Sequence, residues 1–173
     1  MAVTFPYRTV KDVDVRGKRI LLRADYNVPL RDDGSIADDY RLVASLPTLH
    51  YLLERDASIV VIAHLGRPKS EQDTKYSLAP VAKRLAKLLG HPVRFIGETV
   101  GDRVAQLTRL MKPGDIVMLE NLRFQPAEKE NDAKFAQQLA KQSRAELFVQ
   151  DGFGVVHRSH ASTVAIAQCL PAV

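Results

Sequence analysis

The stretch SIVVIAHLGRP, Ser58–Pro68, predicts a strand followed by a turn, and it includes two side chains that can bind a ligand, His64 and Arg67. Its first half is an unbroken apolar run rich in β-branched residues, which predicts a short strand buried on both faces. Gly66 allows backbone angles that other residues avoid, and Pro68 disfavours helix at the residue before it, so the chain must turn directly after the strand. His64 and Arg67 therefore follow the carboxyl end of a central strand, the edge at which open α/β sheets bind ligands.

Strands and helices alternate along the rest of the chain. Apolar runs predict four more strands, over residues 19–25, 93–96, 116–119 and 147–149. Helical spacing predicts helices over residues 40–54, 77–90, 100–111, 131–142 and 161–169, and Pro47 either kinks the first of these or delays its start to about Ser45. This alternation is typical of βαβ units. We therefore expect one domain, residues 1–173, with a three-layer Rossmann-like α/β fold: an open parallel sheet with helices on both faces.

The amino-acid composition is that of a globular domain and leaves several classes of function open. The chain has 173 residues, 46% of them hydrophobic and 26% charged, as in ordinary globular domains. The net charge of +5 suits an anionic partner, either a nucleic acid or a small phosphorylated molecule, although a solvated basic surface would give the same balance. The single cysteine, Cys169, excludes an internal disulfide and is interpreted as a packed hydrophobic residue. No run approaches the roughly 18 apolar residues of a membrane span, and no signal peptide is recognisable, so we expect a cytosolic protein with no membrane partner.

Polar side chains that a buried strand does not need follow four of the predicted strands. They are Asp25 and Asn27; His64 and Arg67; Glu120, Asn121 and Arg123; and Asp151, His157, Arg158 and His160. Right-handed crossovers place the carboxyl ends of parallel strands at one edge, so Arg67, Arg123 and Arg158 should converge there. Arginine forks hold phosphate with paired hydrogen bonds, and Asp25 and Asn27 offer partners for hydroxyl groups. The pattern predicts a site for a phosphorylated sugar or hydroxy acid.

Other motifs give weaker hypotheses. Gly152 and Gly154 follow a strand as in a dinucleotide fingerprint, but His157 stands where the third glycine belongs. His157 and His160 are three residues apart, yet no cysteine or carboxylate cluster accompanies them, so we expect no metal. Asp25 and Asp151 could form an acid–base pair, although helix capping or ion pairs explain them more simply.

A basic nucleic-acid-binding module remains a second class of function, and a Rossmann-type dinucleotide-binding domain a third. The nucleic-acid hypothesis depends on charge alone, because no helix carries a dense lysine and arginine face and aromatic residues make up only 6% of the chain. Tyr26 and Phe153 are interpreted as packing residues.

Five segments resemble the signature blocks of the phosphoglycerate kinase family, in the family's order. They are RADYNVP (Arg23–Pro29), DYRLVASLPTL (Asp39–Leu49), HLGRP (His64–Pro68), LENLRF (Leu119–Phe124) and FVQDGFGVVHRSHAST (Phe148–Thr163). The resemblance covers nearly the whole chain but only the family's N-terminal half. It implies a second α/β domain that binds MgATP or MgADP as co-substrate, whose phosphate-binding motifs this sequence lacks, so no cofactor is expected in this chain.

The resemblance also implies the reaction, phosphoryl transfer between 1,3-bisphosphoglycerate and ADP to give 3-phosphoglycerate and ATP, and a role for each matching residue. His64, Arg67, Arg123 and Arg158 would clamp the phosphate that is not transferred. The neighbouring substrate-binding positions would be Asp25, Tyr26, Asn27, Leu65 and Gly66. Arg41 would be catalytic, facing the transferring phosphoryl group and stabilising its charge.

His157 and His160 would flank and order this basic patch. The partners implied are 3-phosphoglycerate and the family's nucleotide-binding domain, with no nucleic acid, and the chain alone is expected to be a monomer that binds substrate without catalysis. Three positions depart from the family pattern. Gly152 stands where alanine is common, which is expected to loosen its loop; Gln150 replaces asparagine, and Tyr26 replaces phenylalanine or leucine.

Overall fold

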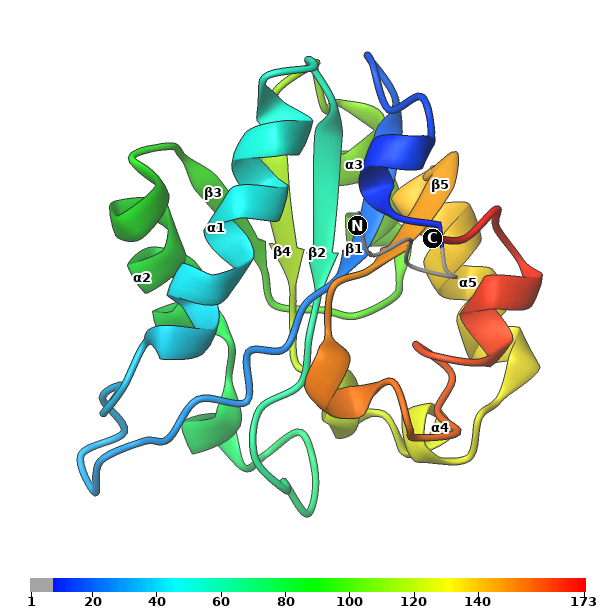
Figure 1. Cartoon of the computed structure of the whole chain (residues 1–173). Helices are drawn as coiled ribbons and strands as arrows, with labels where there is room; N and C mark the ends of the chain where they lie inside the picture. Colours follow the sequence, from blue (N-terminus) through cyan, green and yellow to red (C-terminus); the bar gives the residue numbers. More distant parts are fainter. Residues whose placement is uncertain (1–7) are drawn as a thin grey trace, which may run out of the picture.

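A five-stranded parallel sheet forms the centre of the computed structural model, which describes residues 8–173 (Figure 1). The strands are β1 (Arg19–Arg23), β2 (Ser58–Ile62), β3 (Val93–Ile96), β4 (Ile116–Leu119) and β5 (Leu147–Gln150). Their order across the sheet is β3-β4-β2-β1-β5, and every adjacent pair is parallel. The predicted open parallel sheet is confirmed, with β2 at its centre.

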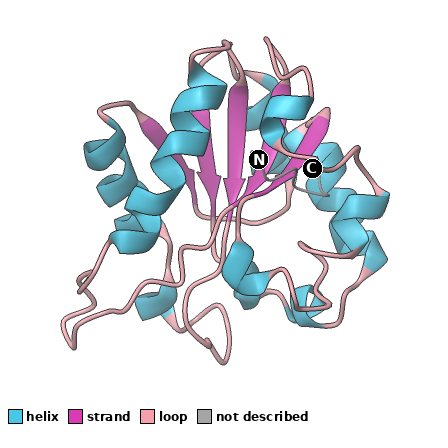
Figure 2. Cartoon of the chain, in the orientation of Figure 1, coloured by secondary structure: helices cyan, strands magenta, loops and turns pink. Residues whose placement is uncertain are grey.

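Helices cover both faces of this sheet (Figure 2). They are α1 (Tyr40–Leu53), α2 (Ala79–Leu89), α3 (Asp102–Arg109), α4 (Pro126–Lys129) and α5 (Ala133–Ser143). One apolar core lies between the sheet and helices α1 and α2, and a second between the sheet and helices α3 and α5. Alternate strand residues supply the two cores: Ile59 and Val61 of β2 belong to the first, and Val60 and Ile62 to the second. The three layers are those expected from the sequence.

Register brings the carboxyl ends of the strands level with one another. Arg23, the last residue of β1, is paired with Ile62 of β2 on one side and with Gln150 of β5 on the other. Val61 of β2 is paired with Met118 of β4. The loops that follow β1, β2, β4 and β5 therefore begin at the same edge, the lower one in Figure 1.

The helices differ from the predictions in some of their boundaries and in two short segments. Pro47 lies inside an uninterrupted α1, because it is on the exposed side, where water can bind the carbonyl left without a donor. Helix α2 starts at Ala79 with Pro80 in its first turn and ends before Gly90, whose φ of 64° gives a left-handed cap. Residues 126–129, for which the sequence pattern predicted no helix, form α4, whereas the predicted helix over residues 161–169 is only a 3-10 turn, Ala165–Gln168.

No helix within residues 8–173 is both long and apolar enough to cross a membrane. Cys169 is partly buried and packs against the second core, as its apolar context predicts.

Candidate functional site

The loop after β2 is held by a glycine and a tyrosine. Gly66 adopts a φ of +60°, and a Cβ at this position would lie 2.2 Å from the Tyr76 ring. Only glycine fits this turn without strain or displacement of the ring. The turn leaves Arg67 exposed, while His64, immediately after the strand, is buried.

Asn121 joins this loop to the loop after β4. Its fully buried amide accepts hydrogen bonds from the backbone of Leu65 (3.2 Å) and Arg123 (3.0 Å) through Oδ1, and its Nδ2 donates to the Leu65 and Tyr76 carbonyls (2.8 and 2.9 Å). Arg123 adds a bond from Nη1 to the Gly66 carbonyl, 2.6 Å long. Two strand ends are thus fixed together by buried hydrogen bonds, as a preformed ligand site requires.

The three arginines expected to converge lie close enough to affect one another. Burial lowers the pKa of Arg123, and the charges of Arg158 and Arg67 lower it further, while Glu128 opposes them. The Nε atoms of Arg123 and Arg158 are buried and have no hydrogen-bond partner among the described residues. Buried donors normally have partners, so these two unpaired groups indicate a place for an acceptor that no described residue supplies.

His64 sits among these cations as a neutral imidazole. Burial lowers its pKa to about 2, and the charges of Arg23, Arg123 and Arg158 contribute in that order. Its Nδ1 lies 3.0 Å from Nη2 of Arg23. His160 also has a lowered pKa, because burial outweighs the opposing effect of Glu128, whose Oε1 lies 3.7 Å from its Nδ1.

Sequence reasoning missed a buried polar network beneath this cluster. Arg23 and Glu128 are fully buried, and Ser162, also buried, lies between them. The available signal was the arginine that directly follows the apolar residues Ile20–Leu22 at the end of β1, since a buried charge needs a partner. Nothing in the sequence pattern identified Glu128 as that partner.

Asp25 and Arg41 form an ion pair at the start of α1, and Asn27 accepts a 2.8 Å hydrogen bond from the Gly66 backbone. The ion pair lines a cavity of about 430 Å³ together with Asp151 and Gly154. A Cβ on Gly154 would lie 2.3 Å from Oδ2 of Asp25, so this glycine allows the loop after β5 to approach the carboxylate. Arg41 remains half-exposed on the cavity wall.

Several predicted residues lie elsewhere than expected. The side chains of Tyr26 and Leu65 are in the core, so only their backbone atoms could meet a ligand. The interpretation of Phe153 as a packing residue is wrong: 89% of it is exposed, because it lies in the surface 3-10 turn Phe153–Val155 that follows β5. His157 is exposed, and its predicted place beside the arginine cluster stays a prediction.

The loop at Gly152 is tightly packed. An added Cβ would lie 3.1 Å from the Val155 side chain, 3.2 Å from Oε1 of Gln150 and 3.3 Å from the Arg23 carbonyl. The Gln150 side chain thus occupies part of the space that alanine would use, so the two departures from the family pattern are spatially linked. Whether the glycine loosens the loop stays a prediction.

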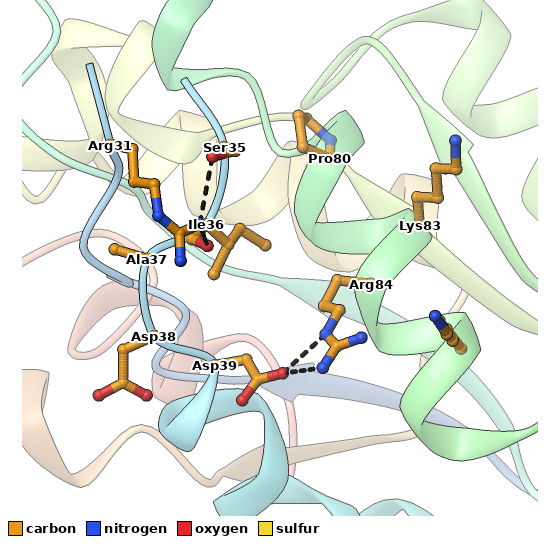
Figure 3. A pocket seen from close by; sticks show the side chains of 10 residues that line it. Arg31, Ser35, Ile36, Ala37, Asp38, Asp39, Pro80, Lys83 and Arg84 are labelled. Atoms are coloured by element: carbon orange, nitrogen blue, oxygen red, sulfur yellow. Dashed lines mark hydrogen bonds and ion pairs between the residues drawn. The ribbon is translucent and has the colours of Figure 1, made fainter. Parts of the chain in front are cut away.

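A hollow of about 750 Å³ lies away from these strand ends, between residues 31–39 and α2 (Figure 3). Its arginines are already paired: Arg31 donates to Ser35 and to the Ile36 carbonyl, and Arg84 to Asp39. Within residues 8–173, no group of three or more potential metal ligands is close enough to hold an ion.

Fold and strand-end chemistry together define an α/β domain of the doubly wound, Rossmann-like class, with cationic side chains gathered at the carboxyl edge of its sheet. The chain belongs to the phosphoglycerate kinase family, whose profile matches residues 10–173. It is 49% identical over 166 residues to the phosphoglycerate kinase of Desulforudis audaxviator and 51% identical over 167 residues to that of Aquifex aeolicus. Each match covers 96% of this chain but only 42% and 41% of the relative.

Solved structures agree with the sequence matches. The phosphoglycerate kinase from Coxiella burnetii superposes with a TM-score of 0.83 and that from Pyrococcus horikoshii with 0.85, each at 33% identity. They cover 96% and 95% of this chain, and 41% of each neighbouring chain is matched. This chain therefore corresponds to about two fifths of the length of the relatives, in the N-terminal region of the enzyme.

Proposed function

We propose that residues 1–173 are the N-terminal, 3-phosphoglycerate-binding domain of a phosphoglycerate kinase. In the complete enzyme this domain would hold the glycerate while a phosphoryl group passes between 1,3-bisphosphoglycerate and ADP. The nucleotide-binding domain would supply the MgADP or MgATP site. We expect the chain by itself to bind substrate as a monomer in the cytoplasm without catalysis, because its sequence lacks the nucleotide phosphate-binding motifs of the family.

The unpaired guanidinium donors of Arg123 and Arg158 are the observation that carries this proposal. Other charges at the edge are already matched, since Arg41 is paired with Asp25 and Arg23 has Glu128 close by. Arg67, Arg123 and Arg158 form no ion pair with any described carboxylate. A phosphate dianion can accept from several guanidinium groups at once, which makes it a suitable counter-charge.

The other substrate positions have separate tasks in this proposal. Asn27 uses its Oδ1 to fix Gly66, which leaves its amide N–H groups to donate to the substrate's hydroxyl or carboxyl end. The Asp25 carboxylate accepts a hydrogen bond from a substrate hydroxyl, and the Leu65–Gly66 backbone forms one wall of the site. Arg41 exchanges its bond to Asp25 for the transferring phosphoryl group, whose spreading charge it stabilises.

Calorimetry with 3-phosphoglycerate tests the proposal. The folded wild-type chain should bind, and Arg67→Ala combined with Arg123→Ala should weaken binding at least about a hundredfold, because each charged hydrogen bond contributes about 1.5–3 kcal/mol. Arg103→Ala removes an exposed arginine of α3 and should leave the affinity unchanged. Raising the ionic strength should weaken wild-type binding.

Absence of a binding heat from the folded wild type at millimolar ligand would refute the assignment. Equal weakening by Arg103→Ala would mean that net charge, and not this cluster, attracts the ligand. Titrations with DNA, RNA and NAD separate the two alternative functions. Mixing the chain with a separately produced nucleotide-binding domain and measuring ATP formation tests the activity of the complete enzyme.

A further inference from the structure

The guanidinium of Arg23 forms hydrogen bonds in three directions from the end of β1. Its Nε donates to the Ser162 hydroxyl (2.9 Å), its Nη1 to the Ala24 carbonyl, and its Nη2 approaches Nδ1 of His64 at 3.0 Å. No part of Arg23 is exposed. The side chain therefore contacts no ligand directly, and its effect must pass through its neighbours.

The direction of each bond follows from the chemistry of the groups. A guanidinium has donors and no acceptor, so Nδ1 of His64 must accept and carry no proton. The proton of the neutral ring then resides on Nε2, which has no hydrogen bond to another described residue. The contact with Arg23 thus selects one of the two tautomers of His64.

Glu128 balances the buried charge through Ser162. A carboxylate only accepts, so the Ser162 hydroxyl donates to Oε1 of Glu128 (2.7 Å) and accepts from Arg23, and the Ser162 backbone N–H donates to Oε2 (3.0 Å). Burial lowers the pKa of Arg23 to about 10, with Glu128 the strongest opposing charge, so Arg23 stays protonated at neutral pH. The direction of every bond in this network is therefore fixed: Arg23 donates to His64 and to Ser162, and Ser162 donates to Glu128.

We propose that Arg23 is a positioning residue that, backed by Ser162 and Glu128, holds His64 as the neutral Nε2–H tautomer and so presents one uncharged donor to the substrate phosphate. This inference rests on the proposed function for the identity of the ligand. A neutral ring adds a hydrogen bond to the cluster without a further positive charge. The charged or titratable groups that face His64 are Arg23 after β1, Arg123 after β4, and Arg158 and His160 after β5.

Nitrogen NMR of the ¹⁵N-labelled chain, without ligand, measures the tautomer directly. The His64 ring is assigned from the signals lost in His64→Gln. Between pH 5.5 and 8 its Nδ1 should give the signal of an unprotonated ring nitrogen and its Nε2 that of a protonated one, with no titration. A protonated Nδ1 in the wild type would overturn the proposal.

The double variant Arg23→Met with Glu128→Gln removes the network while leaving the net charge unchanged. We expect His64 to exchange between tautomers or to titrate in this range, and the affinity for 3-phosphoglycerate to fall roughly tenfold, as expected for one lost hydrogen bond to a charged group. The role of Arg23 would be refuted if, in the folded double variant, Nδ1 of His64 stays unprotonated without titrating and the affinity for 3-phosphoglycerate is unchanged.

Two further measurements keep the test decisive. Ser162→Ala keeps both charges and removes only the hydroxyl that links Arg23 to Glu128, so the His64 signals should change in the same direction as in the double variant, but by less. This single variant provides the test if the double variant does not fold. Unchanged His64 signals in Ser162→Ala would count against the proposal. Because the tautomer is measured without ligand, failure of the wild type to bind 3-phosphoglycerate would refute the proposed function separately from the role of Arg23.

Discussion

Asp151 provides a stability prediction whose size follows from the structure. This carboxyl group lies at the end of β5, largely buried, and its one hydrogen bond with another side chain comes from Thr48 at 2.8 Å. Burial raises its pKa to about 6 from the ordinary 3.8, although the Thr48 bond opposes the shift. Asp151→Asn removes the charge and keeps an oxygen that Thr48 can bond.

The sign of the effect follows from proton binding. Between pH 4 and 6 the folded state binds more protons at Asp151 than the unfolded state, so the free energy of unfolding falls as the pH rises through this window. A shift of about two units at roughly 1.4 kcal/mol each gives a penalty of at most about 3 kcal/mol above pH 6. Because the group keeps some solvent contact, we expect Asp151→Asn to stabilise the chain by about 2 kcal/mol at pH 7.5 and by little at pH 4.

Urea unfolding of wild type and variant at half-unit steps from pH 4 to 8 measures the difference. Asp32→Asn, at an exposed carboxylate of the loop before α1, is the control and should change the free energy of unfolding by less than about 0.5 kcal/mol at every pH. A variant that is no more stable than the wild type at pH 7.5, or a difference that does not depend on pH, would show that the charge of Asp151 is not the source of the penalty.

Further changes test the packing around the site, each by urea unfolding. Gly66→Ala should destabilise the chain by about 2 kcal/mol or more, because φ is +60° and the new Cβ collides with the Tyr76 ring; an unchanged midpoint would contradict this. Tyr26→Phe should cost about 1 kcal/mol, since the buried Ser45 hydroxyl loses its donor, whereas a gain in stability would mean that the phenol is poorly accommodated. Leu85→Ala should cost 2–5 kcal/mol by opening a cavity under α2, and a loss below 1 kcal/mol would place this residue outside a tightly packed core.

Local patterns allowed most of the fold to be predicted. The buried strand β2 and the end of α2 near Gly90 depend on residues close in sequence, and both are as expected. The short helix α4 was missed because Pro126–Lys129 is too brief to show helical periodicity. The exposure of Phe153, in the loop after β5, was also predicted wrongly, because a loop has no hydrophobic periodicity from which buried and exposed positions can be told apart.

The sequence by itself determined the α/β class and the approach of Arg67, Arg123 and Arg158 to one edge, because hydrophobic periodicity and the handedness of βαβ crossovers follow local rules. The tertiary structure alone decided which buried groups pair. Arg23 and Ser162 are 139 residues apart, and Ser162 and Glu128 are 34 apart, so their bonds leave no pattern in the chain. A buried charge takes whatever partner the packing of distant segments brings within hydrogen-bond distance, and only the folded structure specifies that distance.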